Sequence, residues 1–225
     1  MTRIVIFAKA PLPGSVKTRL IPALGADGAA TLACHLLAHT LSQALAADAG
    51  EVELCMSPAP LDPAWQGVTI DSAVKQTAQS SGDLGARMAR AVKRATGQIQ
   101  PADTSVLLIG TDCPALTAPL LKQAALQLEH HDAVMLPAHD GGYVLLGLKS
   151  RCPELFDNMP WSTSVVARQT MQRMAALNLR LWQGPTLHDI DEPTDLQHVP
   201  DSMAQWLRPN MLPMRENNYS NIHRP

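Results

Sequence analysis

Short apolar runs alternate along the chain with longer stretches in which hydrophobic residues recur at helical spacing. A continuous run such as 4–8 predicts a buried strand, while leucines four apart at Leu37, Leu41 and Leu45 predict a helix. The predicted strands are 4–8, 51–56, 68–70, 105–109, 133–136, 143–148 and 179–183. The predicted helices are 27–47, one opening at 82–87, one that begins after a Thr117 cap, 163–177, and a short one around 203–207. This alternation favours an α/β fold, a mostly parallel sheet with helices on both faces.

The chain shows no internal repeat and no linker that would divide it. We therefore expect a single domain over residues 1–208. The remaining segment, 209–225, is polar and poor in core residues. By composition it should be a mobile tail, unless a neighbouring subunit of a homo-oligomer holds it.

Composition narrows the class of protein. Of the 225 residues, 46% are hydrophobic and 17% charged, so the chain should fold around a real core. Eighteen Lys and Arg against 20 Asp and Glu, with 4% aromatic residues, argue against a nucleic-acid partner. The four cysteines are scattered, which favours reduced thiols. The first apolar run is too short for a signal peptide, and none reaches the roughly 18 residues of a membrane span, so we expect a soluble cytoplasmic protein.

The first polar cluster, 13–19, follows the first predicted strand. Ligands of open parallel sheets bind at the carboxyl ends of strands. Gly14 would let backbone N–H groups approach an anion, and Lys17 and Arg19 would neutralise phosphate charge. Two apart on an extended stretch, both side chains should be exposed and point the same way. The cluster is not a P-loop, since Val16 stands where its glycine belongs. A solvated basic turn is the alternative.

Carboxylates follow two other predicted strands. Asp112 lies directly after 105–109, and Asp189 and Asp191 lie in the segment 188–193. One acid alone could simply cap a turn. Two acids from separate strand ends are what Mg²⁺, or Mn²⁺, needs to bridge phosphate oxygens. We predict Asp112 and Asp191 as metal ligands, with Asp189 as the second choice for the latter.

Two further loops carry weaker signals. Asp140, in the turn 138–142, could orient or deprotonate an acceptor hydroxyl, although these are also ordinary hairpin-turn residues. The segment 79–87 joins a glycine-containing loop to a helix N-terminus, which is suited to a nucleotide but common in proteins.

Taken in order, these segments resemble the bacterial radical-SAM/selenodomain-associated transferases, a family commonly labelled glycosyltransferase. The matching motifs are FAKAPLPGSVKTRL at 7–20, GDLGARM at 82–88, IGTDCP at 109–114, DGGY at 140–143, WST at 161–163 and DID at 189–191 with Asp195 and Leu196. The resemblance runs from about residue 3 to 200. It departs at Val144, where family members often have an aromatic residue. It implies the GT-A, nucleotide-diphospho-sugar transferase fold: a three-layer α/β/α sandwich with a mostly parallel mixed sheet.

A more distant resemblance links 17–20, the lone Asp112 and 191–195 to 2-phospholactate guanylyltransferase and the molybdenum cofactor guanylyltransferases. Those enzymes attack the α-phosphate of a nucleoside triphosphate and release pyrophosphate. GT-A glycosyltransferases more often carry a D-x-D on the central strand, whereas Thr111-Asp112-Cys113 supplies one acid. This difference favours nucleotidylyl transfer, while the family label favours glycosyl transfer.

Together these features predict a transferase dependent on Mg²⁺ (or Mn²⁺). Its donor would be a nucleoside triphosphate, or alternatively a nucleotide-sugar, and its acceptor a small phosphorylated or hydroxylated molecule. The expected catalytic residues are Lys17, Arg19, Asp112 and Asp140. The expected nucleotide-binding residues are Ala8, Lys9, Gly14, Lys17, Arg19, Gly82, Asp83, Gly85 and Arg87. The expected acceptor-binding residues are Asp140, Gly141, Gly142, Tyr143, Trp161, Ser162 and Thr163. A binding protein without turnover is the less favoured alternative, because the metal acids and the phosphate cations are all present.

Overall fold

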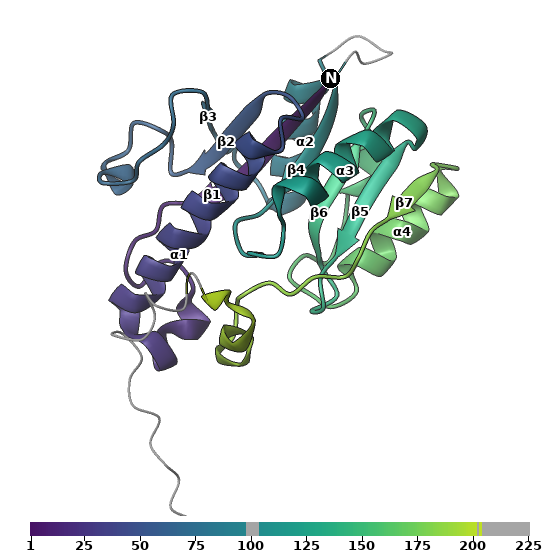
Figure 1. Ribbon diagram of the computed structural model, residues 1–225. Helices are drawn as coiled ribbons and strands as arrows, with labels where there is room; N and C mark the ends of the chain where they lie inside the picture. Colours follow the sequence, from purple (N-terminus) through teal and green to yellow (C-terminus); the bar gives the residue numbers. More distant parts are fainter. Residues whose placement is uncertain (98–103, 202, 204–225) are drawn as a thin grey trace, which may run out of the picture.

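A single seven-stranded mixed sheet runs through the molecule and carries helices on both faces (Figure 1). The computed structural model describes residues 1–97, 104–201 and 203. The strands are β1 (Thr2–Lys9), β2 (Val52–Ser57), β3 (Lys75–Ala78), β4 (Ser105–Ile109), β5 (Ala133–Pro137), β6 (Tyr143–Leu148) and β7 (Leu181–Gln183). Their order is β3-β2-β1-β4-β6-β5-β7, and only β6 runs antiparallel to its neighbours, β4 and β5. The predicted mostly parallel mixed sheet is confirmed.

Two hydrophobic cores, one on each face, hold the helices against the sheet. The helices are α1 (Ile21–Ala46), α2 (Leu84–Thr96), α3 (Ala118–His130) and α4 (Val166–Ala176). In the first core α1 and α3 pack on side chains such as Ile4 and Ile6. In the second, α2 and α4 pack on side chains such as Val5. The apolar run in β1 is continuous because both of its faces are buried, and the three-layer α/β/α architecture is confirmed.

A third, smaller core lies at the start of α1 and positions one part of the site. Leu24, Leu32 and Leu36 from the first half of α1 pack there against Ile190 and Val199. Ile190 is completely buried, although acidic residues flank it on both sides. The segment that carries Asp189 and Asp191 is therefore anchored by an apolar side chain between them.

The predicted strand at 68–70 is wrong, and β3 forms at Lys75–Ala78 instead. Val68 and Ile70 are partly buried against the first core without joining the sheet. β3 is an edge strand with mostly exposed residues, paired only with β2. An edge strand needs no apolar run, so hydrophobicity gave no signal for it.

Helix boundaries also differ from the prediction. α1 begins at Ile21 rather than Asp27, because Pro22 is tolerated in its first turn, and Gly25 (φ 72°) interrupts its helical geometry. Thr117 occupies the N-cap position of α3 without a side-chain cap; instead the Gln43 side chain accepts a hydrogen bond from the Ala118 N–H (2.8 Å). α4 begins at Val166, three residues later than expected, and β7 at Leu181. The tail 209–225 and, apart from Met203, the helix predicted around 203–207 lie outside the described residues.

Strand β2 forms where the sequence predicts a strand, and it carries an acidic residue, Glu53. Glu53 is completely buried. Its Oε1 accepts hydrogen bonds from Thr77 Oγ1 (2.7 Å), from Arg94 Nε (3.0 Å) and from Arg94 Nη2. Arg3 Nη1 lies 3.7 Å from Oε2. The carboxylate tolerates burial because cations from β1 and α2 surround it.

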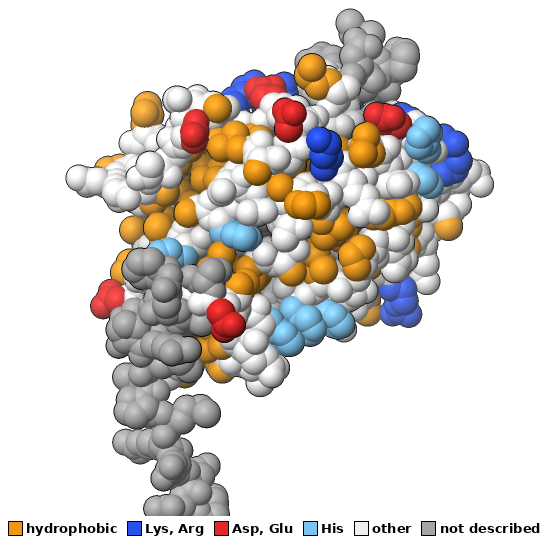
Figure 2. Space-filling view, viewed as in Figure 1, with side chains coloured by type: hydrophobic (Ala, Val, Ile, Leu, Met, Phe, Trp, Pro, Cys, Tyr) orange, Lys and Arg blue, Asp and Glu red, His pale blue; other side chains and the backbone are white. Residues whose placement is uncertain are grey.

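One helix, Thr18–Ala46, is long and apolar enough by length and composition to cross a membrane. A core helix of a folded domain passes the same test, and here Leu36, Leu37 and Leu41 are buried in the two cores that α1 contacts. Figure 2 shows few Lys and Arg side chains among the described residues on the face of α1 and α3. The four cysteines, all described, are free as predicted.

Candidate active site

Two adjoining cavities open at the carboxyl ends of the central strands. The larger, here called the large cleft, encloses about 1470 Å³ open to solvent. It is lined by Phe7, Ala8, Lys9, Ser15, Val16, Lys17, Thr18, Arg19, Ala33, Leu37, Gln79, Gly82, Asp83, Leu84, Arg87, Gly110, Thr111, Asp112, Ser162 and Asp191. The smaller, here called the small pocket, encloses about 440 Å³ and is lined by Gly110, Asp112, Cys113, Ala138, Asp140, Gly142, Tyr143, Val144 and Asp189. Gly110 and Asp112 line both cavities, so the two are contiguous.

Lys17 lies between two carboxylates at the bottom of the large cleft. Its Nζ is 2.6 Å from Asp112 Oδ1 and 3.9 Å from Asp191 Oδ1, and it donates to the Ile190 carbonyl oxygen (2.5 Å). Only 5% of its side chain is exposed. The prediction of an exposed Lys17 is wrong, because the carboxylates brought together here attract the ammonium group when no other cation is present.

Arg19 meets the same acidic segment from the solvent side. Its Nη1 donates to Asp191 Oδ2 (2.7 Å) and lies 3.7 Å from Glu192 Oε1, with 62% of the side chain exposed. The segment is not extended as predicted: Lys17 has a left-handed backbone (φ 48°), and Thr18–Leu20 forms a 3-10 helix. The two cations nevertheless converge, because both lie within 4 Å of Asp191.

Backbone hydrogen bonds bring the acidic segment to the end of β4. The Ile190 N–H donates to the Asp112 carbonyl (2.8 Å), and the His139 N–H donates to the Leu187 carbonyl (3.0 Å). Asp195 Oδ2 accepts from the N–H groups of Asp191 (3.0 Å) and Glu192 (2.7 Å). The chain after β7 therefore lies across the ends of β4 and β5, which places Asp191 in the large cleft and Asp189 in the small pocket.

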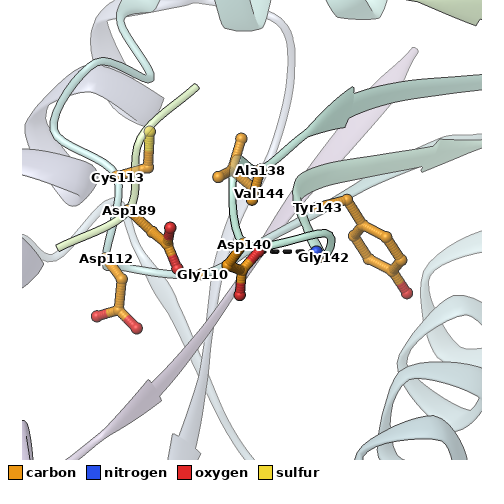
Figure 3. Close-up of a pocket in the computed structure, with 9 residues that line it drawn as sticks. All are labelled: Gly110, Asp112, Cys113, Ala138, Asp140, Gly142, Tyr143, Val144 and Asp189. Atoms are coloured by element: carbon orange, nitrogen blue, oxygen red, sulfur yellow. Dashed lines mark hydrogen bonds between the residues drawn. The ribbon is translucent and has the colours of Figure 1, made fainter. Parts of the chain in front are cut away.

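Asp140 and Asp189 both line the small pocket, and Figure 3 shows one oxygen of Asp140 directed at Gly142. Asp140 Oδ1 accepts from the Gly142 N–H (2.7 Å), which fixes the turn. Burial, together with the negative charges of Asp140, Asp112 and Asp191, raises the pKa of Asp189 to about 6. The pocket therefore has a negative potential that a proton, a cation or a hydrogen-bond donor would relieve.

Two other groups lining the small pocket are unsuited to acid–base work at neutral pH. Burial raises the pKa of the Cys113 thiol to about 11, so it stays protonated and a poor nucleophile. Burial also raises the pKa of Tyr143. Figure 3 shows its phenol ring turned away from the carboxylates, and its hydroxyl lies 3.9 Å from Met88 Sδ.

The loop before α2 is braced by its own polar side chains. Asp83 Oδ1 caps α2 by accepting from the Ala86 N–H (2.8 Å). Arg87 Nε donates to the Gly82 carbonyl (2.8 Å), and Arg87 Nη1 donates to Gln79 Oε1 (3.2 Å). Gln79 Nε2 in turn donates to the Ala8 carbonyl (3.1 Å). The sequence placed Gln79 at the start of this loop without assigning it to the site, yet its amide ties the loop to the end of β1.

Most of the predicted site residues line one of the cavities. The large cleft collects Ala8, Lys9, Lys17, Arg19, Gly82, Asp83, Arg87, Asp112, Asp191 and also Ser162. The small pocket collects Asp112, Asp140, Gly142, Tyr143 and the second-choice ligand Asp189. It also contains Gly110, Cys113, Ala138 and Val144, which were not predicted as site residues. Gly110 and Ala138 directly follow β4 and β5, so their position after a strand is a signal that the sequence offers.

Five predicted residues line neither cavity: Gly14, Gly85, Gly141, Trp161 and Thr163. Two of these glycines act through packing. A Cβ on Gly85 would come within 2.8 Å of the Trp161 indole, whose buried Nε1 has no hydrogen-bond partner among the described residues. A Cβ on Gly141 would overlap the backbone of Ser164. These glycines let the loops before α2 and before α4 close around the site.

The donor set fits a hard divalent cation that arrives with phosphate. Among the described residues, no three His, Cys, Asp or Glu side chains converge on one point. Mg²⁺, however, usually takes one or two carboxylates plus substrate phosphates and water rather than a complete protein cage. Asp112 and Asp191 both reach the Lys17 ammonium group. The Lys17 ammonium group lies between these two carboxylates, which shows that both can contact one cation.

The sheet order, the layers and the cavities at the strand ends define an α/β protein with the GT-A type of nucleotide-diphospho-sugar transferase fold. Within that class the chain belongs to the bacterial family DUF2064, described as uncharacterized proteins conserved in bacteria, whose model matches residues 40–163. A search of curated proteins finds no match.

Solved structures agree with this placement. A Desulfovibrio desulfuricans G20 protein provisionally named a nucleotide-diphospho-sugar transferase is 32% identical, over 93% of this chain and 94% of that one, with a TM-score of 0.80. A cytidylyltransferase from Leptospira borgpetersenii is 15% identical (91% and 87% covered, TM-score 0.59). Rv0371c from Mycobacterium tuberculosis, solved with manganese, is 14% identical (92% and 97% covered, TM-score 0.50). The last two show the fold alone.

Proposed function

We propose that this protein is a divalent-metal-dependent transferase that moves a nucleotidyl group from a nucleoside triphosphate to a small acceptor. The observation that carries the proposal is the pair of contiguous cavities sharing Gly110 and Asp112. The large cleft contains Lys9, Lys17, Arg19 and Arg87, and the small pocket contains carboxylates. A phosphate-bearing donor would occupy the first and an acceptor the second, with the reacting phosphate near Asp112.

In the large cleft the cations would hold the donor's phosphates. The Arg19 side chain is 62% exposed, and its planar guanidinium group can donate hydrogen bonds to two phosphate oxygens. Lys17 would act as a point charge. The loop Gly82–Arg87 would contact the ribose or the base. Asp112 and Asp191 would hold the metal, which when bound neutralises charge on the phosphate oxygens. The manganese complex of Rv0371c supports a metal of this class.

In the small pocket Asp140 would accept a hydrogen bond from the acceptor hydroxyl and orient its oxygen toward the α-phosphorus. A new O–P bond forms as the bond to the β-phosphate oxygen breaks, and pyrophosphate leaves. The hydroxyl proton passes to a pocket carboxylate or to water. Such transfers need little covalent participation by protein, so positioning and charge neutralisation would supply most of the rate.

Glycosyl transfer from a nucleotide-sugar is the second candidate. It is favoured by the name given to the 32% identical Desulfovibrio protein. The same cleft would hold the diphosphate, and a nucleoside diphosphate would leave instead of pyrophosphate. The products therefore separate the two reactions.

The experiment is a thermal-shift screen of nucleoside triphosphates and nucleotide-sugars with Mg²⁺ or Mn²⁺, followed by product analysis. A true donor at 100 times its dissociation constant adds about 2.7 kcal/mol to the free energy of unfolding. Pyrophosphate release supports nucleotidylyl transfer, and nucleoside diphosphate release supports glycosyl transfer. Stabilisation without any product indicates a binding protein, and no stabilisation by any nucleotide refutes the proposal.

Asp112→Asn tests the shared residue directly. The variant should fold, because the Lys17 ammonium group keeps Asp191 and the Ile190 carbonyl oxygen as partners, but it should lose turnover. Asp27→Asn is the matched control, since Asp27 is exposed and lines neither cavity. Full activity in Asp112→Asn would remove this residue from the mechanism.

A further inference from the structure

The small pocket differs from the large cleft in its cations. Among the described residues, its lining includes the carboxyl groups of Asp112, Asp140 and Asp189 and no Lys, Arg or His side chain. The large cleft next to it has both signs of charge: Lys9, Lys17, Arg19 and Arg87 line it together with Asp83, Asp112 and Asp191. The site therefore offers cations to the donor and carboxylates to whatever binds in the second cavity.

Two of these carboxylates have no cationic partner. Asp112 is paired with Lys17 at 2.6 Å. Asp140 accepts a backbone N–H, and among the described residues neither Asp140 nor Asp189 forms an ion pair. Both side chains line the pocket wall, so a molecule bound there meets two carboxyl groups that form no ion pair.

Residues next to the lining residues Ala138 and Asp189 include two histidines, which belong to a stack of three rings. His188 lies between His139 and His198, with ring centroids 3.8 Å apart and planes inclined by 12° on each side. Partial burial and the two adjacent imidazoles lower the pKa of His188. The central ring of the stack therefore stays neutral at neutral pH.

The remaining wall of the pocket is apolar, formed by Cys113, Ala138 and Val144, of which all three are buried. The cavity itself is about 140 Å³ and opens to solvent, so it accommodates a small group or part of a small molecule rather than a polymer segment. Such a molecule would place hydrogen-bond donors on the carboxylates and a carbon face on the apolar wall. A hydroxylated ring or chain has this distribution of groups.

We propose that the acceptor is a hydroxyl compound without anionic groups, neutral or amine-bearing, and that the small pocket rejects phosphorylated and carboxylated acceptors. Hydroxyl and ammonium groups donate to Asp140 and Asp189, whereas a phosphate there would meet the like charge of two carboxylates that form no ion pair among the described residues. This inference rests on the proposed transferase function and restricts its acceptor to one class. It separates this chain from enzymes that act on phosphorylated acceptors.

The experiment uses the full-length protein with the donor found in the nucleotide screen. A bacterial small-molecule extract is divided on an anion exchanger at neutral pH into an unbound fraction, which is neutral or cationic, and a bound, anionic fraction. We expect the unbound fraction to raise donor consumption at least about tenfold over water alone, and the bound fraction to leave it unchanged. Stimulation by the bound fraction, or by neither, overturns the acceptor class. Failure to find a donor at all would instead refute the proposed function.

A charge variant tests the reason for the preference. Phosphatase treatment of the bound fraction, which removes phosphate groups, should convert part of it into active acceptors. In Asp189→Asn the ratio of stimulation by the unbound fraction to stimulation by the bound fraction should fall about tenfold, and in Asp27→Asn it should not change. Because a ratio is compared, a lower overall rate in the variant does not affect the result. An unchanged ratio in Asp189→Asn would show that charge does not select the acceptor.

Discussion

The ammonium group of Lys17 stands between Asp112 and Asp191, where the sequence led us to expect a divalent cation. A tethered cation in this place neutralises the carboxylates when nucleotide is absent. It also competes with any free metal ion for the same oxygens, until phosphates offer the lysine another partner.

Lys17→Met should therefore bind free Mn²⁺ more tightly than the wild-type protein, by roughly ten- to a hundredfold if one charge-assisted contact of about 1.5–3 kcal/mol is removed. Electron paramagnetic resonance of Mn²⁺ without nucleotide measures this. Lys122→Met, on an exposed position of α3, is the control and should not change the affinity. Weaker Mn²⁺ binding in Lys17→Met would mean that the lysine does not compete with metal.

Arg19 differs from Lys17 in exposure, and its variants should separate binding from folding. Arg19→Ala should change the free energy of unfolding by less than about 1 kcal/mol, because its ion pairs are on the surface. Nucleotide affinity, measured by calorimetry, should fall roughly ten- to a hundredfold. Arg19→Lys should restore only part of the affinity if the planar fork matters. Equal nucleotide affinity in the wild-type protein, Arg19→Ala and Arg19→Lys would mean that segment 13–19 is only a solvated basic turn.

At the scale of elements, the turn between β5 and β6 is held against the start of α4. The Gly141 carbonyl accepts from the Ala167 N–H (2.9 Å), and the Gly141 backbone has a φ of 91°. The turn 138–142 is therefore a hairpin turn that also positions Asp140. The two interpretations are compatible, because turn residues such as glycine allow the backbone to approach α4 closely.

Gly141→Ala should destabilise the protein by clearly more than the roughly 1–2 kcal/mol that a left-handed backbone costs a residue with a Cβ. The added Cβ overlaps the Ser164 backbone, so the loop before α4 must move. Gly14→Ala is the matched control: its φ is 77°, but no atom lies within 4 Å of the new Cβ. Urea unfolding measures both, and equal losses would show that the contact with Ser164 is not rigid.

At the scale of the whole molecule, one buried charge joins the sheet to a helix. Glu53 on β2 binds Arg94 of α2 and Thr77 of β3, and Arg3 of β1 lies nearby. Removing one member of such a group leaves the other buried charges without a partner. The loss in the free energy of unfolding is then larger than the net contribution of the intact group.

Glu53→Ala should lower the free energy of unfolding by about 3–5 kcal/mol. Glu51→Ala is the control from the same segment, because Glu51 is a partly exposed acid paired with Arg3 and Lys75, and its loss should cost less than about 1 kcal/mol. Chemical denaturation of the two variants measures the difference. Similar values would mean that water reaches the Glu53 carboxylate.

The sequence by itself determined the elements whose signal is local. Apolar runs predicted β1, β4 and β6, and the spacing of leucines predicted α1, where the structure has them. The polar motifs directly follow predicted strands in the chain, so their place at strand ends could also be read from the sequence. The edge strand β3 had no such signal, since a strand with one neighbour and exposed side chains needs no apolar run.

Only the tertiary structure decided which polar groups meet. The hydrogen bond from the Ile190 N–H to the Asp112 carbonyl, the burial of Lys17 and the meeting of Asp140 and Asp189 in one pocket depend on the order of strands in the sheet. Sheet order is set by long-range packing of two cores, which no local pattern encodes. Residue types therefore predicted that cations and carboxylates would act together, while the fold determined that the cations line one cavity and that carboxylates line both.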